Sequence, residues 1–105
     1  MRMWNINPKK MCRQHLLGEH LEMHMFLGTL KKKKSIKGYL DKGLVEVHNI
    51  KKRHDELVDE MKKRGYNHKS PLKKFKLDKI GNVNIKNNKI ELIKRCKECR
   101  KLLID

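Results

Sequence analysis

Apolar residues recur at helical spacing in three segments of this 105-residue chain. The first segment begins at Asn7-Pro8, an N-cap followed by a residue that presets the first turn, and runs to about Leu30. The run Lys31–Lys34 ends it, and residues 1–6 before it form a short arm. One stripe of this helix carries Cys12, Leu16, Met23, Leu27 and Leu30.

Two further helices are predicted by the same periodicity. One runs from Asn49 to Arg64, and Gly65 stands where a left-handed C-terminal cap belongs. The other runs from about Asn84 to Leu103. The apolar stripe of the second helix is Ile50, His54, Leu57 and Met61, and that of the third is Ile85, Leu92, Cys96, Cys99 and Leu103.

Two connecting stretches lack this periodicity. Residues 38–47 are expected to be looped or strand-like, and residues 66–83, which contain Ser70-Pro71 and Gly81, to be irregular. The chain shows no repeat and no linker. We therefore expect an all-α fold, a single domain over residues 1–105 with three main helices, long loops and an N-terminal arm packed near the first helix.

The charge of the chain points to a polyanionic partner. Lys and Arg number 28 against 12 Asp and Glu, for a net charge of +16. Self-repulsion on so small a body opposes compaction, whereas DNA binding releases counterions. A solubilising lysine surface is the alternative. Aromatic residues make up only 5% of the chain, which argues against the stacking platform of single-strand binders and favours double-stranded DNA.

Membrane and secretory classes are not indicated. No apolar run approaches the roughly 18 residues of a membrane span, and no secretory apolar region follows Met1. Three cysteines, an odd number, argue against a disulfide framework and for a reducing compartment. We expect an intracellular monomer with no membrane partner and no cofactor.

A polar constellation stands on the first helix. His15 and Glu22 are seven residues apart, so they lie within about 20° of each other around a helix axis. Gly18 lies between them on that face and destabilises the helix by about 1 kcal/mol relative to alanine. Such a glycine suits a close approach by the arm or by a nucleotide. Ordinary surface residues making local helix pairs are the alternative.

This segment resembles a known family of repair enzymes. Gln14-His15-Leu16 with Glu19 and Glu22 is similar, in residue type and spacing, to the first helix of the phage pyrimidine-dimer DNA glycosylases, the endonuclease V type. A second similarity covers Lys63-Arg64-Gly65-Tyr66-Asn67, and the third helix is similar only in pattern. The resemblance spans most of the chain.

The resemblance implies a nucleophile and an acidic catalyst. The family's nucleophile is the α-amine of the N-terminal residue, which falls here on Met1, and its acidic catalyst falls on Glu22. Met1 should be retained because methionine removal needs a small second residue and Arg2 is large. His15 is expected to orient the sugar or the phosphate beside this pair.

The chemistry suits these groups. An α-amine has a pKa of about 7.7–8.0 against about 10.4 for lysine, so it is far more often unprotonated at neutral pH and free to form an imine at sugar C1′. Glu22 would stabilise the developing cation and move protons during β-elimination. The residues expected to contact damaged DNA are Arg2, Arg13, Gln14, His20, His24 and Lys89, and the run Lys31–Lys34 is either a further contact or a solvated turn.

The segment also departs from the family. Leu21 and Met25 stand where the family places arginines, and His20 and His24 are additional. A modified base or an abasic site is therefore an alternative target to a pyrimidine dimer.

Two other function classes are open. A metal-dependent nuclease would use His20 and His24, at i and i+4, with Glu19 or His15, although the spacing fits no standard zinc signature. A non-catalytic DNA-binding protein would use the same residues structurally.

The pair Cys96 and Cys99 forms one CxxC without a second pair. On the apolar face of a predicted helix it is more typical of core, and zinc held with Cys12 and a histidine is the alternative. We assign no metal from the sequence.

Overall fold

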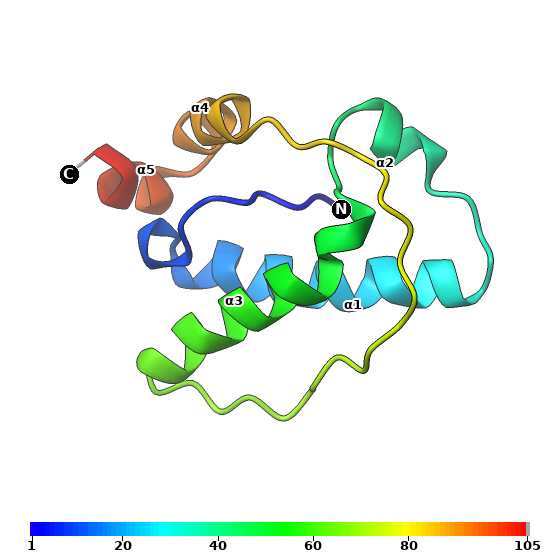
Figure 1. Cartoon of the computed structure of the whole chain (residues 1–105). Helices are drawn as coiled ribbons and strands as arrows, with labels where there is room; N and C mark the ends of the chain where they lie inside the picture. The colour runs from blue at the N-terminus through cyan, green and yellow to red at the C-terminus, as the bar shows by residue number, and fades with distance from the viewer. Residues whose placement is uncertain (105) are drawn as a thin grey trace.

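The computed structural model describes residues 1–104, all of whose regular elements are helical. The elements are the 3₁₀ turn η1 (Pro8–Lys10), α1 (Arg13–Lys31), α2 (Lys37–Asp41), the 3₁₀ turn η2 (Val47–Asn49), α3 (Ile50–Lys63), α4 (Ile85–Arg95) and α5 (Lys97–Ile104). Figure 1 shows their arrangement. The predicted all-α class is confirmed. None of the helices in this described part is long and apolar enough to cross a membrane.

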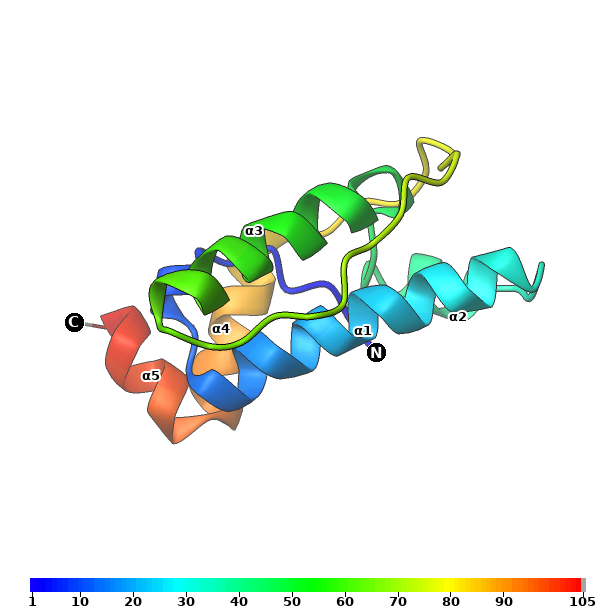
Figure 2. The same ribbon diagram turned by 90° about the horizontal axis from the view of Figure 1, so that it is seen from below.

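The main helix pair is α1 and α3, which run alongside each other in both views (Figures 1 and 2). The predicted stripe of α3 is buried throughout, and on α1 Leu16, Met23 and Leu27 are buried as predicted. Cys12 and Leu30 are only half-buried. Burying a side chain such as leucine or methionine contributes about 1.5–3 kcal/mol, so this seam is the main source of stability.

The first helix starts later than the sequence predicts. Asn7 and Pro8 do begin a helical turn, and the Asn7 side chain accepts a hydrogen bond from Lys9 N at 3.1 Å, but that turn is η1. The chain is extended at Met11 before α1 begins at Arg13. A long-range contact keeps the turn separate. The Arg64 guanidinium donates to the main-chain oxygens of Pro8 and Met11 at 3.0 and 2.7 Å.

The predictions for the two connecting stretches, residues 38–47 and 66–83, have different outcomes. The prediction for residues 38–47 was wrong over residues 38–41, which belong to the short helix α2. Tyr39 of this helix packs edge-on against Phe26 with ring centroids 5.2 Å apart. Residues 66–83 are irregular, as predicted. The predicted cap is confirmed, with Gly65 at φ +82° and Tyr66 N donating to Met61 O at 2.9 Å.

The predicted third helix is broken in two at Cys96. This residue is extended, with φ −128° and ψ 115°, and separates α4 from α5. The prediction of one continuous helix was therefore wrong, and so was the burial of Ile85, which is 53% exposed. The break turns α5 back toward the start of α1, where Cys99 Sγ accepts a hydrogen bond from Cys12 N at 3.2 Å.

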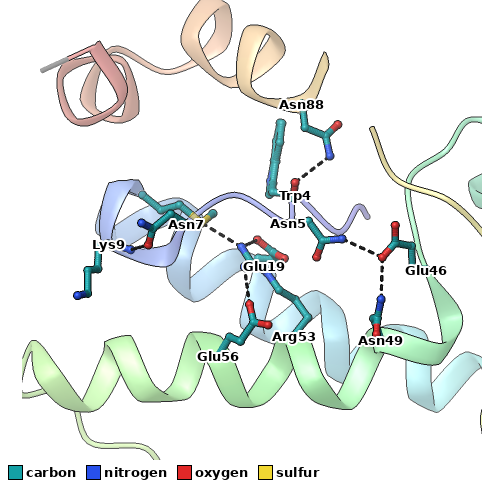
Figure 3. A network of polar contacts seen from close by, with 11 residues as sticks. Trp4, Asn5, Asn7, Lys9, Glu19, Glu46, Asn49, Arg53, Glu56 and Asn88 are labelled. Atoms are coloured by element: carbon teal, nitrogen blue, oxygen red, sulfur yellow. Dashed lines mark hydrogen bonds and ion pairs between the residues drawn. The ribbon is translucent and has the colours of Figure 1, made fainter. Parts of the chain in front are cut away.

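The N-terminal arm is buried next to α1, as predicted, and α4 holds it from the other side (Figures 1 and 3). Met3 N donates to Leu44 O at 2.6 Å, and Asn88 of α4 donates to Met3 O and Trp4 O at 3.2 and 2.9 Å. At Asn5 the chain adopts φ 55°, a left-handed conformation that asparagine tolerates. These contacts fix the direction in which the chain terminus points.

An ion pair lies beneath the arm (Figure 3). Arg53 of α3 donates through Nε and Nη2 to the two carboxylate oxygens of Glu19 on α1, at 2.5 and 2.9 Å. Both side chains are at most 2% exposed. The pair links α1 to α3 at the level of the arm, and Arg53 Nη1 also donates to Glu56 of α3 at 3.2 Å.

Candidate active site

A pocket of about 360 Å³ opens at the N-terminus of the chain, within the roughly 300–1,000 Å³ range of small-molecule sites. It is formed by the arm, α1, the segment after α2 and the end of α4. Its lining residues are Met1, Arg2, Trp4, His15, Glu22, Leu44 and Arg95. All three residues predicted as catalytic therefore lie in one pocket.

The Met1 amine faces the Glu22 carboxylate. The nitrogen lies 3.7 Å from Oε1, and the two side chains are 13% and 27% exposed. This separation allows an ion pair but is longer than a direct hydrogen bond. Both groups are thus held close together on a wall that solvent and a ligand can reach.

His15 lies on the same face of α1 as Glu22, as the spacing predicts. Its ring meets the edge of Trp4 with centroids 6.0 Å apart, and its Nδ1 is 3.3 Å from Cys12 Sγ. Burial, and secondarily the nearby positive charge of Arg95, lower the pKa of His15 below its usual value of 6.5. The imidazole is therefore neutral at neutral pH and suited to hydrogen bonding rather than to charge pairing.

Two guanidinium groups flank the pocket. Arg2 lies over the Trp4 ring at 4.3 Å from its centroid, and Arg95 lies at 5.6 Å from the same centroid. Arg2 Nη2 donates to Asn88 Oδ1 at 3.3 Å, while its buried Nε has no partner among residues 1–104. These two guanidinium groups can donate hydrogen bonds to a phosphate oxygen.

Sequence reasoning missed three lining residues: Trp4, Leu44 and Arg95. Trp4 is the only tryptophan of the chain and stands three residues after Met1, which is a signal that could have placed it in the site. Arg95 carries no such signal, because nothing distinguishes it along the chain from the other basic residues.

The other predicted DNA contacts lie outside this pocket. Arg13 and Gln14 are exposed at the start of α1, where Arg13 lies 5.2 Å from the centroid of the Tyr66 ring. Lys89 is exposed on α4. Only Arg2 of the predicted DNA-binding set lines the pocket, and the roles of the others stay predictions.

His20 and His24 belong to a second polar cluster, with His54 and His68. His20 packs against the other three rings with centroids 4.8–5.0 Å apart, and His24 Nε2 lies 3.1 Å from His54 Nε2. Burial, followed by the like charge of the neighbouring histidines, lowers the pKa of His20 to about 4. The four rings pack against one another between α1, α3 and the irregular stretch.

Two groups of side chains could hold a metal ion. One is Cys12, His15, Cys96 and Cys99, and the other is His20, His54 and His68. The set weighed for a metal-dependent nuclease is not brought together, because Glu19 is bound to Arg53 and His15 lies beside the cysteines. The structure therefore does not bring Glu19 or His15 to His20 and His24, whose rings lie with centroids 5.0 Å apart.

Gly18 does not receive the arm. A Cβ built there meets no atom within 4 Å, so the expected close approach of the arm was wrong. The glycine instead leaves open space on α1 between His15 and Glu22.

The comparisons with known proteins give the class. No curated protein and no solved structure matches the chain. A family model does match residues 1–74, which hold the arm, α1 and α3, and it describes DNA glycosylases. The chain belongs to the pyrimidine dimer DNA glycosylase family.

Proposed function

We propose that this protein excises pyrimidine dimers from double-stranded DNA and then cuts the strand as an abasic-site lyase, with the Met1 α-amine as nucleophile. The observation that carries this proposal is the position of the Met1 nitrogen, 3.7 Å from a Glu22 oxygen in an open pocket. An amine and a carboxylate on one wall are the two groups that imine chemistry at a sugar requires.

The first step is attack on the sugar. The unprotonated Met1 nitrogen bonds to C1′, the C1′–N bond to the damaged base breaks, and the base leaves with that electron pair and takes up a proton. Glu22 stabilises the cationic character that develops at the sugar ring. Loss of the amine proton and opening of the ring then give the imine between Met1 and C1′.

The second step is β-elimination. A base removes a proton from C2′, that electron pair forms the C2′=C3′ double bond of a conjugated imine, and the C3′–O bond breaks with the 3′ phosphate as leaving group. The Glu22 carboxylate, 3.7 Å from the Met1 nitrogen, serves as this base or relays the proton. Water finally hydrolyses the imine and releases Met1.

A terminal amine suits this role better than the lysines of the chain. Among residues 1–104, no lysine lines the pocket. An ordinary α-amine is also unprotonated in a much larger fraction at neutral pH than an ordinary lysine. Position and chemistry therefore favour the same nitrogen.

Binding relies on charge. A net charge of +16 supplies sequence-independent attraction to the phosphates, and Arg2 and Arg95 supply local contacts at the pocket. Flipping a nucleotide into the pocket costs a few kcal/mol and is easiest at a damaged, poorly stacked base.

The test is reduction of the imine by borohydride. Untagged protein, whose free Met1 amine is first verified by intact mass, is incubated with duplexes containing either a cyclobutane dimer or an abasic site. We expect a covalent adduct on both, with the modified peptide containing Met1. Glu22→Gln should lose the adduct on dimer DNA. The matched control is Glu98→Gln, an exposed carboxylate far along the chain on α5.

Three outcomes would contradict parts of the proposal. An adduct mapped to a lysine would refute Met1 as nucleophile. An adduct on abasic DNA alone would keep the lyase and refute dimer excision. No adduct from protein that binds both duplexes would refute imine chemistry and favour a non-catalytic DNA-binding protein.

A further inference from the structure

A second chemical cluster lies at the start of α1 and shares His15 with the pocket. The Sγ atoms of Cys12, Cys96 and Cys99 and a ring nitrogen of His15 all lie within 4.8 Å of one another. Cys99 is fully buried, and Cys12 and Cys96 are half-buried against the core. Cys12 and His15 lie more than 80 residues before Cys96 and Cys99 in the chain, so the fold itself assembles this group.

The spacing of these atoms fits a single tetrahedral ion. A zinc ion about 2.3 Å from sulfur and about 2.0–2.1 Å from nitrogen separates two sulfurs by about 3.8 Å and a sulfur from a nitrogen by about 3.5 Å. Cys12 Sγ lies 3.8 Å from Cys96 Sγ and 3.3 Å from His15 Nδ1. The sulfur–sulfur distance is too long for a disulfide, and both distances are close to those expected around a shared ion.

The backbone around the cluster places two of the sulfurs at helix N-termini and two within reach of main-chain amides. Cys12 is the N-cap of α1, and Cys96 immediately precedes α5, so both sulfurs stand at helix N-termini where negative charge is favoured. Cys12 N donates to Cys99 Sγ at 3.2 Å, and Cys99 N donates to Cys96 Sγ at 3.4 Å. Main-chain amides thus point at two of the three sulfurs.

A purely apolar core accounts for less of this geometry. Three cysteines packed in an apolar core would require neither the His15 Nδ1 atom 3.3 Å from Cys12 Sγ nor a break in a helix. The helix predicted to run from Asn84 to Leu103 is interrupted at Cys96, and that interruption is what brings both Cys96 and Cys99 to Cys12. A ligand set of two short motifs, Cys-x-x-His and Cys-x-x-Cys, explains both features.

We propose that Cys12, His15, Cys96 and Cys99 form a structural zinc site that ties α4 and α5 to the start of α1. Three thiolates and one neutral imidazole fill a tetrahedral shell and leave no open position, as in other structural zinc sites. Binding displaces the thiol protons, so the site carries one net negative charge. Because α4 holds the arm through Asn88, the metal stabilises the arm as well.

The site also has a consequence for the pocket. Zinc on Nδ1 of His15 fixes the ring tautomer with the proton on Nε2. Since His15 lines the Met1 pocket, that N–H becomes a hydrogen-bond donor for a bound sugar or phosphate. This consequence alone depends on the proposed function, whereas the metal site does not.

The test measures metal in the full chain without any DNA. Protein produced in zinc-supplemented medium is purified under reducing conditions and its zinc content is measured by mass spectrometry. We expect one zinc ion per chain. Replacement by cobalt should give the intense visible absorption of tetrahedral cobalt bound to thiolates. Both signals should be lost in Cys96→Ser, whose side chain is half-buried, and in Cys99→Ser.

The matched control is His68→Ala, which alters the histidine cluster and leaves the cysteines intact; it should keep the zinc. Zinc lost in His68→Ala but kept in Cys96→Ser would overturn the proposal by placing the metal at the histidines. Absence of zinc together with no thiolate spectrum on cobalt titration of the unmodified chain would also overturn it. That last measurement does not depend on whether any variant folds.

Discussion

Asn88 Nδ2 donates a hydrogen bond to Trp4 O at 2.9 Å across a buried interface between α4 and the N-terminal arm. The same nitrogen donates to Met3 O at 3.2 Å. Asn88 lies outside residues 1–74, which the family model matches, yet it holds the segment that carries the proposed nucleophile. The C-terminal helices therefore contribute to the site by positioning the arm.

Replacing Asn88 with alanine should loosen the arm. Two main-chain oxygens lose their donor in a buried setting, which costs about 1–3 kcal/mol per unsatisfied group. We expect lower stability in urea unfolding and slower borohydride trapping at Met1. Asn87→Ala, on the exposed side of the same helix turn, is the control and should change neither. Equal trapping rates in both variants would show that the arm does not need this anchor.

The Glu19–Arg53 pair should be sensitive to removal of one partner. Arg53→Ala leaves the fully buried Glu19 carboxylate without its counterion, and breaking such a pair destabilises a protein by about 3–5 kcal/mol. Lys37→Ala, which breaks an exposed pair with Asp41 on α2, is the control and should have little effect. Thermal unfolding compares the two. Similar losses of stability would contradict the structural importance of the buried pair.

Local sequence patterns were sufficient to predict which residues share a face of a helix. The periodicity of Leu16, Met23 and Leu27 predicted the buried face of α1, and the spacing of His15 and Glu22 predicted that they share a face. These predictions succeed because a helix converts sequence spacing directly into direction.

Features set by contacts between distant residues were not predictable. The late start of α1 depends on Arg64 binding the oxygens of Pro8 and Met11, and Arg95 enters the pocket only because α4 packs over the arm. The break at Cys96 likewise follows from sulfur atoms that meet across the fold. No local signal encodes a partner more than 50 residues away.

Arg95 should act as a phosphate contact for the proposed reaction. Arg95→Gln removes a positive charge from the pocket wall, so DNA affinity should fall, and the slope of log K against log salt should shrink by about 0.9 for one lost phosphate contact. Lys94→Gln, the exposed neighbour, is the control for loss of net charge. Binding of a dimer-containing duplex over a salt series measures both. An identical slope for Arg95→Gln and the unmodified protein would refute the contact.

The open space at Gly18 gives opposite effects for small and large substitutions. Gly18→Ala meets no atom within 4 Å and should stabilise the helix by about 1 kcal/mol, with trapping unchanged. Gly18→Leu should keep the fold but reduce DNA binding, because its side chain fills the space between His15 and Glu22. Gly28→Ala and Gly28→Leu on the same helix are the matched controls. Normal DNA binding by Gly18→Leu would show that no nucleotide approaches there.

The four-histidine cluster should make stability depend on pH. The pKa of His20 is about 4 in the folded chain against an ordinary value of 6.5, because burial and then the neighbouring His54, His24 and His68 disfavour its charge. Between these pH values the unfolded chain binds a proton that the folded chain does not. Acidification through this window therefore favours unfolding, and stability should fall as the pH drops from 6.5 toward 4.

His20→Gln should flatten this dependence. Glutamine has no proton to gain in the unfolded chain, so the contribution of this position disappears, although the lowered pKa of His24 leaves part of the slope. His48→Gln changes a histidine outside the four-histidine cluster and is the control. Urea unfolding from pH 4 to 7 gives the slope for each variant. If His20→Gln and His48→Gln reduce the pH dependence of stability equally, acid sensitivity does not arise from the packed rings.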